Sequence, residues 1–302
     1  MRFVSFVVAN QPPRFGVLLT DELVLDCYEA AEVPQPAEYL EWFDEAGASH
    51  GAARQLAEQA SKDPAKRREL EACGAAIPLA DVQLLAPVPR PGKVLCIGLN
   101  YRDHAEESKM AIPEAPLIFS KFPTSVCGPE HPVLLAAGST EVDYEAEFGV
   151  VIGRTATRVA VEDAMDAVLG YTNVNDVSAR DFQFADGQWQ RGKSCDTFAP
   201  SGPWLVSRDA IADPHKLRIS FRLNGKTLQD SNTDQLIFGV PQLVSYISES
   251  ITLEPGDLIA TGTPPGVGFA RKPPIYLQDG DRMEVEVEGL GVLHNPCTRS
   301  SG

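Results

Sequence analysis

Three acidic residues have the types and spacing that suggest chemistry. Glu145 and Glu147 run into the apolar stretch 148–152, and Asp176 ends a later stretch, G-Y-T-N-V-N-D. The apolar stretch predicts a strand that enters a core, so Glu145 and Glu147 point the same way, about 7 Å apart along the backbone. Two adjacent carboxylates repel each other unless a cation or protons separate them. With Asp176 they would form the all-oxygen site that Mg²⁺ or Mn²⁺ prefers, although Glu-x-Glu alone also fits a solvated edge strand.

A histidine and a glutamate three residues apart form a second candidate. His104 and Glu107 lie in N-Y-R-D-H-A-E-E, and on a helical turn they would share a face and could hydrogen-bond. A carboxylate partner orients an imidazole and raises its basicity, which is what a general base requires. The alternative interpretation is a surface ion pair.

Several cationic residues stand in unusual surroundings. Lys121 lies in the apolar stretch I-F-S-K-F, so it either extends to solvent or meets a partner. Lys193 lies among small and polar residues in R-G-K-S-C, away from any charged face. Arg180 and Asp181 open a predicted helix after Asp176 and could pair with each other. Beside a carboxylate cluster, a partner for Lys121 becomes the favoured alternative.

The glycine-rich segment Gly262 to Phe269 follows a predicted strand. Its prolines, and the lack of a following helix, argue against a dinucleotide cradle. We interpret it as a tight loop that brings backbone N–H groups and Thr261 or Thr263 near a ligand, with a plain turn as the alternative. The sequence contains no H-E-x-x-H, G-x-S-x-G or P-loop pattern.

The elements that position these residues fall into two parts. Residues 1 to about 85 predict a small antiparallel sheet and two helices, followed by a proline-rich crossing. Later residues predict many short strands, a hairpin at Asn224-Gly225 and few helices. The predicted helices span residues 36–46, 52–73, 103–109, 161–169 and 240–250. We therefore predict an α+β, mainly β chain with domains at 1–85 and 86–302, and a mixed sheet closed around a site.

Composition limits the classes of partner. The chain has 302 residues and a formal net charge of -16, which argues against nucleic acid or an anionic membrane as a partner. Six scattered cysteines without a C-x-x-C pattern fit a reducing compartment. We find no signal peptide or apolar run of membrane-spanning length, so we predict a cytoplasmic location. An anionic substrate would need a locally positive site, which a metal ion and a few cations could supply.

Together these segments resemble the fumarylacetoacetate hydrolase family over roughly residues 90 to 298. The resemblance rests on seven segments in the same order: G-L-N-Y-R-D-H-A-E-E, P-L-I-F-S-K-F-P-T-S, V-D-Y-E-A-E-F-G-V-V-I-G, G-Y-T-N-V-N-D-V-S-A-R-D, R-G-K-S, L-I-A-T-G-T-P-P-G-V-G and D-G-D-R-M-E-V-E-V-E-G-L-G. It implies a rolled mixed β-sheet core, barrel-like in outline. Residues 1–85 resemble the small N-terminal α+β domain of longer bacterial members. The family resemblance also implies a homodimer.

The resemblance assigns roles to individual residues. It implies a divalent cation, Mg²⁺ or Mn²⁺, held by Glu145, Glu147 and Asp176. It further implies that Lys193 contacts substrate or metal-bound oxygen, and that His104 with Glu107 activates water on a short lid helix. The residues that we expect to bind substrate are Lys121, Arg180, Gln183, Thr261, Gly262 and Thr263.

The family includes carbon–carbon hydrolases of acylpyruvates and other diketo acids, decarboxylases of oxaloacetate-type acids, and isomerases of unsaturated keto acids. All of them stabilise an enolate next to a chelated 2-keto acid. Because the His104–Glu107 dyad suits attack by water, we predict a metal-dependent hydrolase of a 2,4-diketo acid, a small anionic substrate. The alternatives are a decarboxylase of oxaloacetate-type acids or an isomerase of unsaturated 2-keto acids. A non-catalytic metal-binding relative is the alternative of another class.

Overall fold

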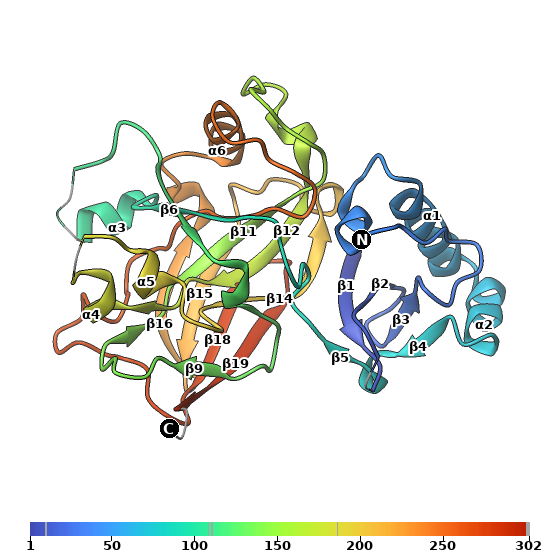
Figure 1. Cartoon of the computed structure of the whole chain (residues 1–302), viewed down its shortest axis with the longest axis horizontal. Coiled ribbons are helices and arrows are strands. Elements are labelled where there is room, and N and C mark those ends of the chain that lie inside the picture. The colour runs from blue at the N-terminus through green and yellow to red at the C-terminus, as the bar shows by residue number, and fades with distance from the viewer. Residues whose placement is uncertain (10, 108, 110, 186, 300–302) are drawn as a thin grey trace.

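A twelve-stranded mixed sheet runs through the molecule (Figure 1). The computed structural model describes residues 1–302 except residues 10, 108, 110, 186 and 300–302. Along the sheet the strands follow the order β4 (Ala76–Pro78), β3 (Leu23–Asp26), β2 (Arg14–Leu18), β1 (Arg2–Val7), β14 (Ala199–Ser207), β12 (Val168–Asn175), β11 (Ala146–Ile152), β17 (Leu258–Ala260), β6 (Val94–Gly98) and β7 (Leu117–Lys121). In addition β5 (Gln83–Leu84) pairs with β1, and β8 (Val126–Cys127) pairs with β14.

A five-stranded sheet packs against the central part of the large sheet. Its order is β16 (Lys226–Asn232), β15 (Arg218–Leu223), β18 (Arg282–Val287), β19 (Val292–Arg299) and β9 (Val133–Leu135). The main core cluster lies between the two sheets and joins Phe148 and Tyr171 of the large sheet to Phe221 and Val285 of the small one. The mainly β, mixed-sheet prediction is therefore confirmed, and the Asn224-Gly225 hairpin joins β15 to β16. In the described part of the chain the large sheet runs from β4 to β7 without closing into a barrel.

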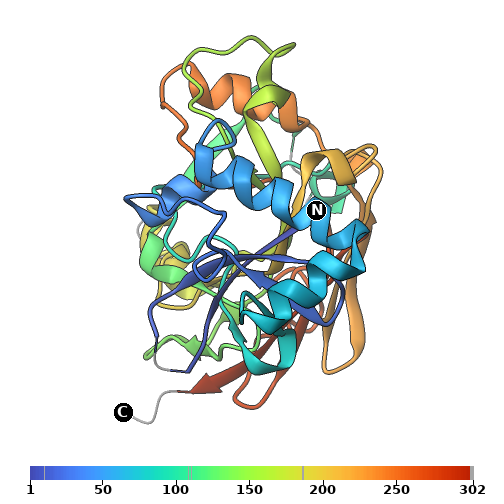
Figure 2. The ribbon, with the colours of Figure 1, turned by 90° about the vertical axis from the view of Figure 1, so that its right-hand side faces the viewer.

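The N-terminal residues extend the large sheet. Strand β1 pairs with β14, with Phe3 opposite Leu205. The helices α1 (Ala48–Lys62) and α2 (Pro64–Ala72) cover the outer face of the N-terminal strands (Figure 2). Leu56 of α1 packs in a second core cluster with Phe3 and Phe15. The boundary that we predict between residues 85 and 86 is thus crossed by one sheet, and it stays a prediction.

The remaining helices are short. They are α3 (Arg102–Glu107), α4 (Arg180–Gln183), α5 (Gln190–Lys193) and α6 (Val240–Ser248). The helix predicted over 103–109 corresponds to α3, with residue 108 outside the described residues. None of the helices in the described ranges combines the length and apolar character needed to span a bilayer.

Three of the helix predictions differ from the structure. The stretch 36–46 forms only a 3₁₀-helix at Tyr39–Phe43, and 161–169 forms one at Ala164–Ala167 before β12 begins. The stretch 52–73 is divided into α1 and α2, because Asp63 caps a new helix that has Pro64 in its first turn. The Asp63 side chain accepts a hydrogen bond from the Ala65 N–H at 2.8 Å.

Candidate metal centre

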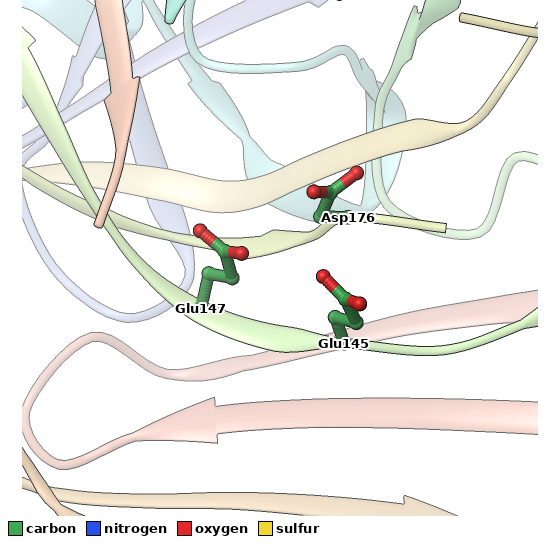
Figure 3. Close-up of side chains that lie close together, drawn as sticks. All are labelled: Glu145, Glu147 and Asp176. Atoms are coloured by element: carbon green, nitrogen blue, oxygen red, sulfur yellow. The ribbon is translucent and has the colours of Figure 1, made fainter. Parts of the chain in front are cut away.

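The register of β11 and β12 brings the three predicted carboxylates together. Glu147 lies in β11 opposite Val174, and Glu145 precedes the strand. The Asp176 N–H donates to the Glu145 carbonyl at 2.9 Å, so these residues face each other where the strand pair ends. Each residue offers one carboxylate oxygen within 4.8 Å of the others, and all three side chains point into the same space (Figure 3). All three residues are buried, and Glu145, at 8% exposure, is the most accessible of them.

Two buried lysines contact this cluster. Lys193 Nζ lies 2.9 Å from Glu145 Oε2 and 2.7 Å from Asp176 Oδ2. Lys121 Nζ contacts the other Asp176 oxygen and also donates to the Val177 carbonyl at 2.9 Å. Lys121 therefore meets a partner, which is the favoured of the two alternatives. Burial alone would raise the pKa of Glu145, but the charges of Lys193 and Arg180 outweigh it and lower this pKa to about 2.

Of the three carboxylates, Glu147 is the one without a salt bridge to a described lysine or arginine. Among the residues that the structure describes, no lysine or arginine forms a salt bridge with it, and its Oε2 accepts the Gly262 N–H at 2.8 Å. Burial, together with the charges of Asp176 and Glu145, raises the pKa of Glu147 well above its usual value. A buried anion of this kind needs a proton or a cation. Oxygen donors from three carboxylates suit a hard divalent cation, so the residues present fit Mg²⁺ or Mn²⁺.

The glycine-rich loop lies alongside the segment that carries the glutamates. Thr261 and Thr263 donate their hydroxyl groups to the carbonyls of Phe148 and Ala146 at 2.8 and 2.9 Å. Gly262, between them, has a φ of +102° and donates to Glu147, as described above. The loop therefore holds the strand that carries the candidate metal ligand Glu147. The threonine hydroxyls face backbone carbonyls, and substrate contacts by these residues stay a prediction.

Arg180 is buried against the cluster. Its Nη2 lies 2.6 Å from Glu145 Oε1 and 2.9 Å from Asp143 Oδ2, and its Nη1 donates to Gln183 Oε1 at 2.9 Å. Asp181 instead accepts from Ser139, so the pairing that we predicted between Arg180 and Asp181 is wrong. The helix α4 turns the two side chains in different directions. Substrate binding by Arg180 and Gln183 stays a prediction.

The histidine–glutamate dyad lies on α3. His104 Nδ1 is 3.5 Å from Glu107 Oε2, which is longer than a normal hydrogen bond. In the described part of the chain this buried nitrogen has no hydrogen-bond partner. Glu107 Oε2 also accepts the Gly266 N–H at 3.1 Å, so the glycine-rich loop contacts both the dyad and Glu147 of the carboxylate cluster. The close approach agrees with a dyad, and its chemical role stays a prediction.

Sequence reasoning left one central residue without a role. Asp143 is fully buried, bonds Arg180, and accepts the N–H groups of Gly268 and Phe269 at 2.7 and 3.1 Å. The signal was present, because the period of two that joins Glu145 to Glu147 also includes Asp143.

Comparison with known proteins decides the family. The model for the C-terminal region of fumarylacetoacetate hydrolase matches residues 93–298, more than half of the chain. The chain belongs to the fumarylacetoacetate hydrolase family. Among its relatives, "Oxaloacetate tautomerase Fahd2a, mitochondrial" of Rattus norvegicus is 50% identical over 230 residues, covering 76% of this chain and 74% of the relative.

Solved structures of the family agree over the whole chain. The 5-carboxymethyl-2-hydroxymuconate delta-isomerase of Mycobacterium smegmatis matches with a TM-score of 0.76 at 35% identity, covering 99% of this chain and 100% of the other. A fumarylacetoacetate hydrolase from Exiguobacterium antarcticum matches with a TM-score of 0.81 at 34% identity, with the same coverage. The chain is therefore an enzyme of this family. The tautomerase and isomerase names support our alternative better than the hydrolase prediction. The mitochondrial name of the rat relative does not confirm a cytoplasmic location.

Proposed function

We propose that this enzyme is a metal-dependent keto–enol tautomerase of a short 2-keto dicarboxylic acid of the oxaloacetate type. The observation that carries this proposal is the 50% identity to a relative named oxaloacetate tautomerase, over the part of the chain that contains the carboxylate cluster. A cluster flanked by buried lysines also suits an anionic substrate, although the whole chain is acidic. We keep the homodimer as a prediction from the family.

Tautomerisation needs a site that stabilises negative charge on an oxygen and moves a proton at carbon. Glu145, Glu147 and Asp176 would hold a divalent cation, which supplies positive charge where the 2-keto oxygen becomes an enolate. Lys193 Nζ lies on the same cluster, 2.7 Å from Asp176, and adds positive charge there. These residues stabilise the enolate that every reaction of the family shares, so they do not by themselves select one reaction.

His104 and Glu107 supply the proton-transfer step. In this proposal His104 takes a proton from C3 of the keto acid and delivers it to the enolate oxygen, and in the reverse direction it carries the proton of the enol hydroxyl to C3. Glu107 orients the imidazole and is itself held by the Gly266 N–H. The dyad that led us to predict attack by water therefore serves proton transfer at carbon equally well. Its presence does not distinguish a hydrolase from a tautomerase.

The hydrolase remains the second candidate, because a structural neighbour is named as a fumarylacetoacetate hydrolase. One experiment separates the candidates. The protein is incubated with Mg²⁺ or Mn²⁺ and enol oxaloacetate, and decay of the enol absorbance is followed while pyruvate is assayed in parallel. An acylpyruvate is tested in the same way, with products identified by mass.

We expect accelerated enol decay that stops with a chelator, without matching release of pyruvate. Pyruvate formed from oxaloacetate as fast as the enol decays would identify a decarboxylase. Cleavage of the acylpyruvate, without enol decay, would replace the proposal with the hydrolase.

A further inference from the structure

Asp143 joins the metal ligands to the glycine-rich loop. Its Oδ2 accepts from Arg180 Nε at 2.9 Å, and Arg180 Nη2 reaches Glu145 Oε1 at 2.6 Å. Asp143 is therefore linked through the Arg180 guanidinium to Glu145, the most exposed of the three carboxylates. A planar guanidinium holds two carboxylates in a fixed relative geometry, which an ammonium group cannot do.

Asp143 also fixes the far end of the loop. The Gly268 N–H donates to its Oδ1 and the Phe269 N–H to its Oδ2. A Cβ added at Gly268 would lie 2.4 Å from Asp143 Oδ1 and 1.9 Å from the Ile275 carbonyl oxygen, so this close approach requires glycine. The bonds place the Phe269 ring over Arg180, whose Cζ lies 4.4 Å from the ring centroid.

The guanidinium of Arg180 is consequently held on every side. Asp143, Glu145 and Gln183 accept its hydrogen bonds in the plane, and Phe269 covers its face. We propose that Asp143 is a positioning residue for the metal ligand Glu145 and acts through Arg180. This inference rests on the proposed metal-dependent function, but metal binding tests it without any substrate.

The reason is the sharing of Arg180 between two carboxylates. With Asp143 present, the guanidinium divides its charge and Glu145 keeps a defined orientation. Without that carboxylate, Arg180 would pair with Glu145 alone and compete with a cation for it. Mutation of a residue that orients a metal ligand typically lowers metal affinity by about 10–100-fold.

The test uses the full chain and Mn²⁺ alone, with free Mn²⁺ measured by electron paramagnetic resonance. We expect Asp143→Asn to weaken Mn²⁺ binding on the order of 10-fold or more. Asp26→Asn is the matched control, because Asp26 is also buried, pairs with an arginine and accepts a backbone N–H. Asp26 lies in β3, away from the carboxylate cluster at the end of β11 and β12, so the Mn²⁺ affinity of Asp26→Asn should equal that of the unmodified protein. Unchanged Mn²⁺ affinity in Asp143→Asn overturns the proposal.

A double-mutant cycle tests the route through Arg180. In an Arg180→Gln background, Asp143→Asn should change Mn²⁺ affinity by less than about twofold, because coupled residues do not act additively. Additive losses overturn the proposal. If Asp143→Asn does not fold, Arg180→Lys provides a second test. Lysine keeps the buried positive charge beside Asp143 and Glu145 but cannot hold two carboxylates in a fixed relative geometry. Arg180→Lys should weaken Mn²⁺ binding, and unchanged affinity contradicts the positioning role.

Turnover gives a separate readout. In Asp143→Asn the Mn²⁺ concentration for half-maximal tautomerase activity should rise by the same factor as the Kd, while kcat at saturating Mn²⁺ changes little. A fall in kcat without a change in Mn²⁺ affinity overturns the proposal. If the unmodified protein lacks tautomerase activity, the proposed function fails, and the Mn²⁺ measurements still decide the role of Asp143.

Discussion

At the residue scale, Glu147 shows that a carboxyl group suited to metal binding can lower the stability of the folded protein without the metal. Burial, together with the charges of Asp176 and Glu145, raises its pKa, and among the described residues it has no lysine or arginine in a salt bridge with it. We expect Glu147→Gln to remove the stabilisation that Mn²⁺ gives, because binding to the folded state alone raises stability by mass action. In the presence of a chelator the variant should melt at the same temperature as the unmodified protein or higher, since glutamine avoids the cost of burying an ionisable carboxyl group beside Asp176 and Glu145. Thermal unfolding with and without Mn²⁺ measures both effects.

The control is Glu29→Gln, a change to an exposed glutamate in the N-terminal part. It should keep the Mn²⁺-dependent rise in melting temperature. A rise that persists in Glu147→Gln would exclude this residue as a metal ligand.

The sharpest prediction about the reaction concerns His104. If it transfers the proton, His104→Ala should slow tautomerisation on the order of 10²–10⁴-fold. Glu107→Gln should cost less, because it removes the orientation of the base and leaves the base itself. Mn²⁺ affinity should stay the same in both variants, since neither residue is a ligand in this proposal. Steady-state enol decay and Mn²⁺ titration measure the two quantities.

His131, which is exposed, supplies the matched control, and His131→Ala should leave the rate unchanged. Full tautomerase activity in His104→Ala would remove the dyad from the mechanism and assign proton transfer to another group.

The carboxylate cluster could be predicted because it depends on short-range regularity. Glu145 and Glu147 share a side through the strand period, and that is visible in sequence. The partners of Glu145 could not be predicted in the same way. Arg180 approaches from α4, and only the register of β11 and β12 and the path of the loop decide that it meets Asp143 and not Asp181.

At the scale of elements, the start of α6 carries a titratable cap. His215 Nε2 accepts the Val240 N–H at 3.0 Å, so its proton is on Nδ1, which lies 3.6 Å from Asp213 Oδ1. Burial lowers the pKa of His215 below its usual value of 6.5, and Asp213 only partly opposes this. At a pH between the pKa of His215 in the folded chain and its pKa in the unfolded chain, the unfolded chain binds more protons. The stability that the neutral His215 cap contributes is therefore present above about pH 6.5 and is lost as the pH falls.

We therefore expect the melting temperature to fall as the pH is lowered from about 7 to 5. His215→Gln keeps an acceptor near the Nε2 position but cannot be protonated, so its melting temperature should fall less. Thermal unfolding across this pH range measures the difference. His50 is buried, unlike the half-buried His215, and its pKa is also lowered by burial, so it contributes to the remaining slope. His131→Gln is the control and should follow the unmodified protein, and an identical slope in His215→Gln would exclude the cap as a source.

The mispredicted helices have physical causes at this scale. Apolar residues in 161–169 recur with helical spacing, but Val168 and Leu169 already belong to β12, between β11 and β14. Sheet pairing therefore overrides the local preference after one 3₁₀ turn. The hairpin at Asn224-Gly225 was predictable, because both residues adopt the positive φ that such a turn requires, 52° and 77°.

At the scale of the whole molecule, the N-terminal residues share a core with the rest of the chain. The second core cluster joins Phe3 and Phe15 to Leu169, Leu205 and Leu258 of the central strands. Composition distinguishes the two parts, and so the sequence predicts a boundary near residue 85. Sequence patterns do not reveal that β1 will pair with β14, because this contact joins segments about two hundred residues apart.

The shared core predicts that residues 86–302 do not fold normally alone. Removing residues 1–85 would expose Leu169, Leu205 and Leu258, and burial of one such side chain is worth about 1.5–3 kcal/mol. The sum is comparable to the total stability of a typical domain, about 5–15 kcal/mol, and β14 would also lose its partner β1. We expect the fragment to aggregate or to lack a cooperative thermal transition, and co-expression with residues 1–85 to restore Mn²⁺-dependent stabilisation. A fragment that melts cooperatively and binds Mn²⁺ as tightly as the whole chain would establish residues 86–302 as an independent domain.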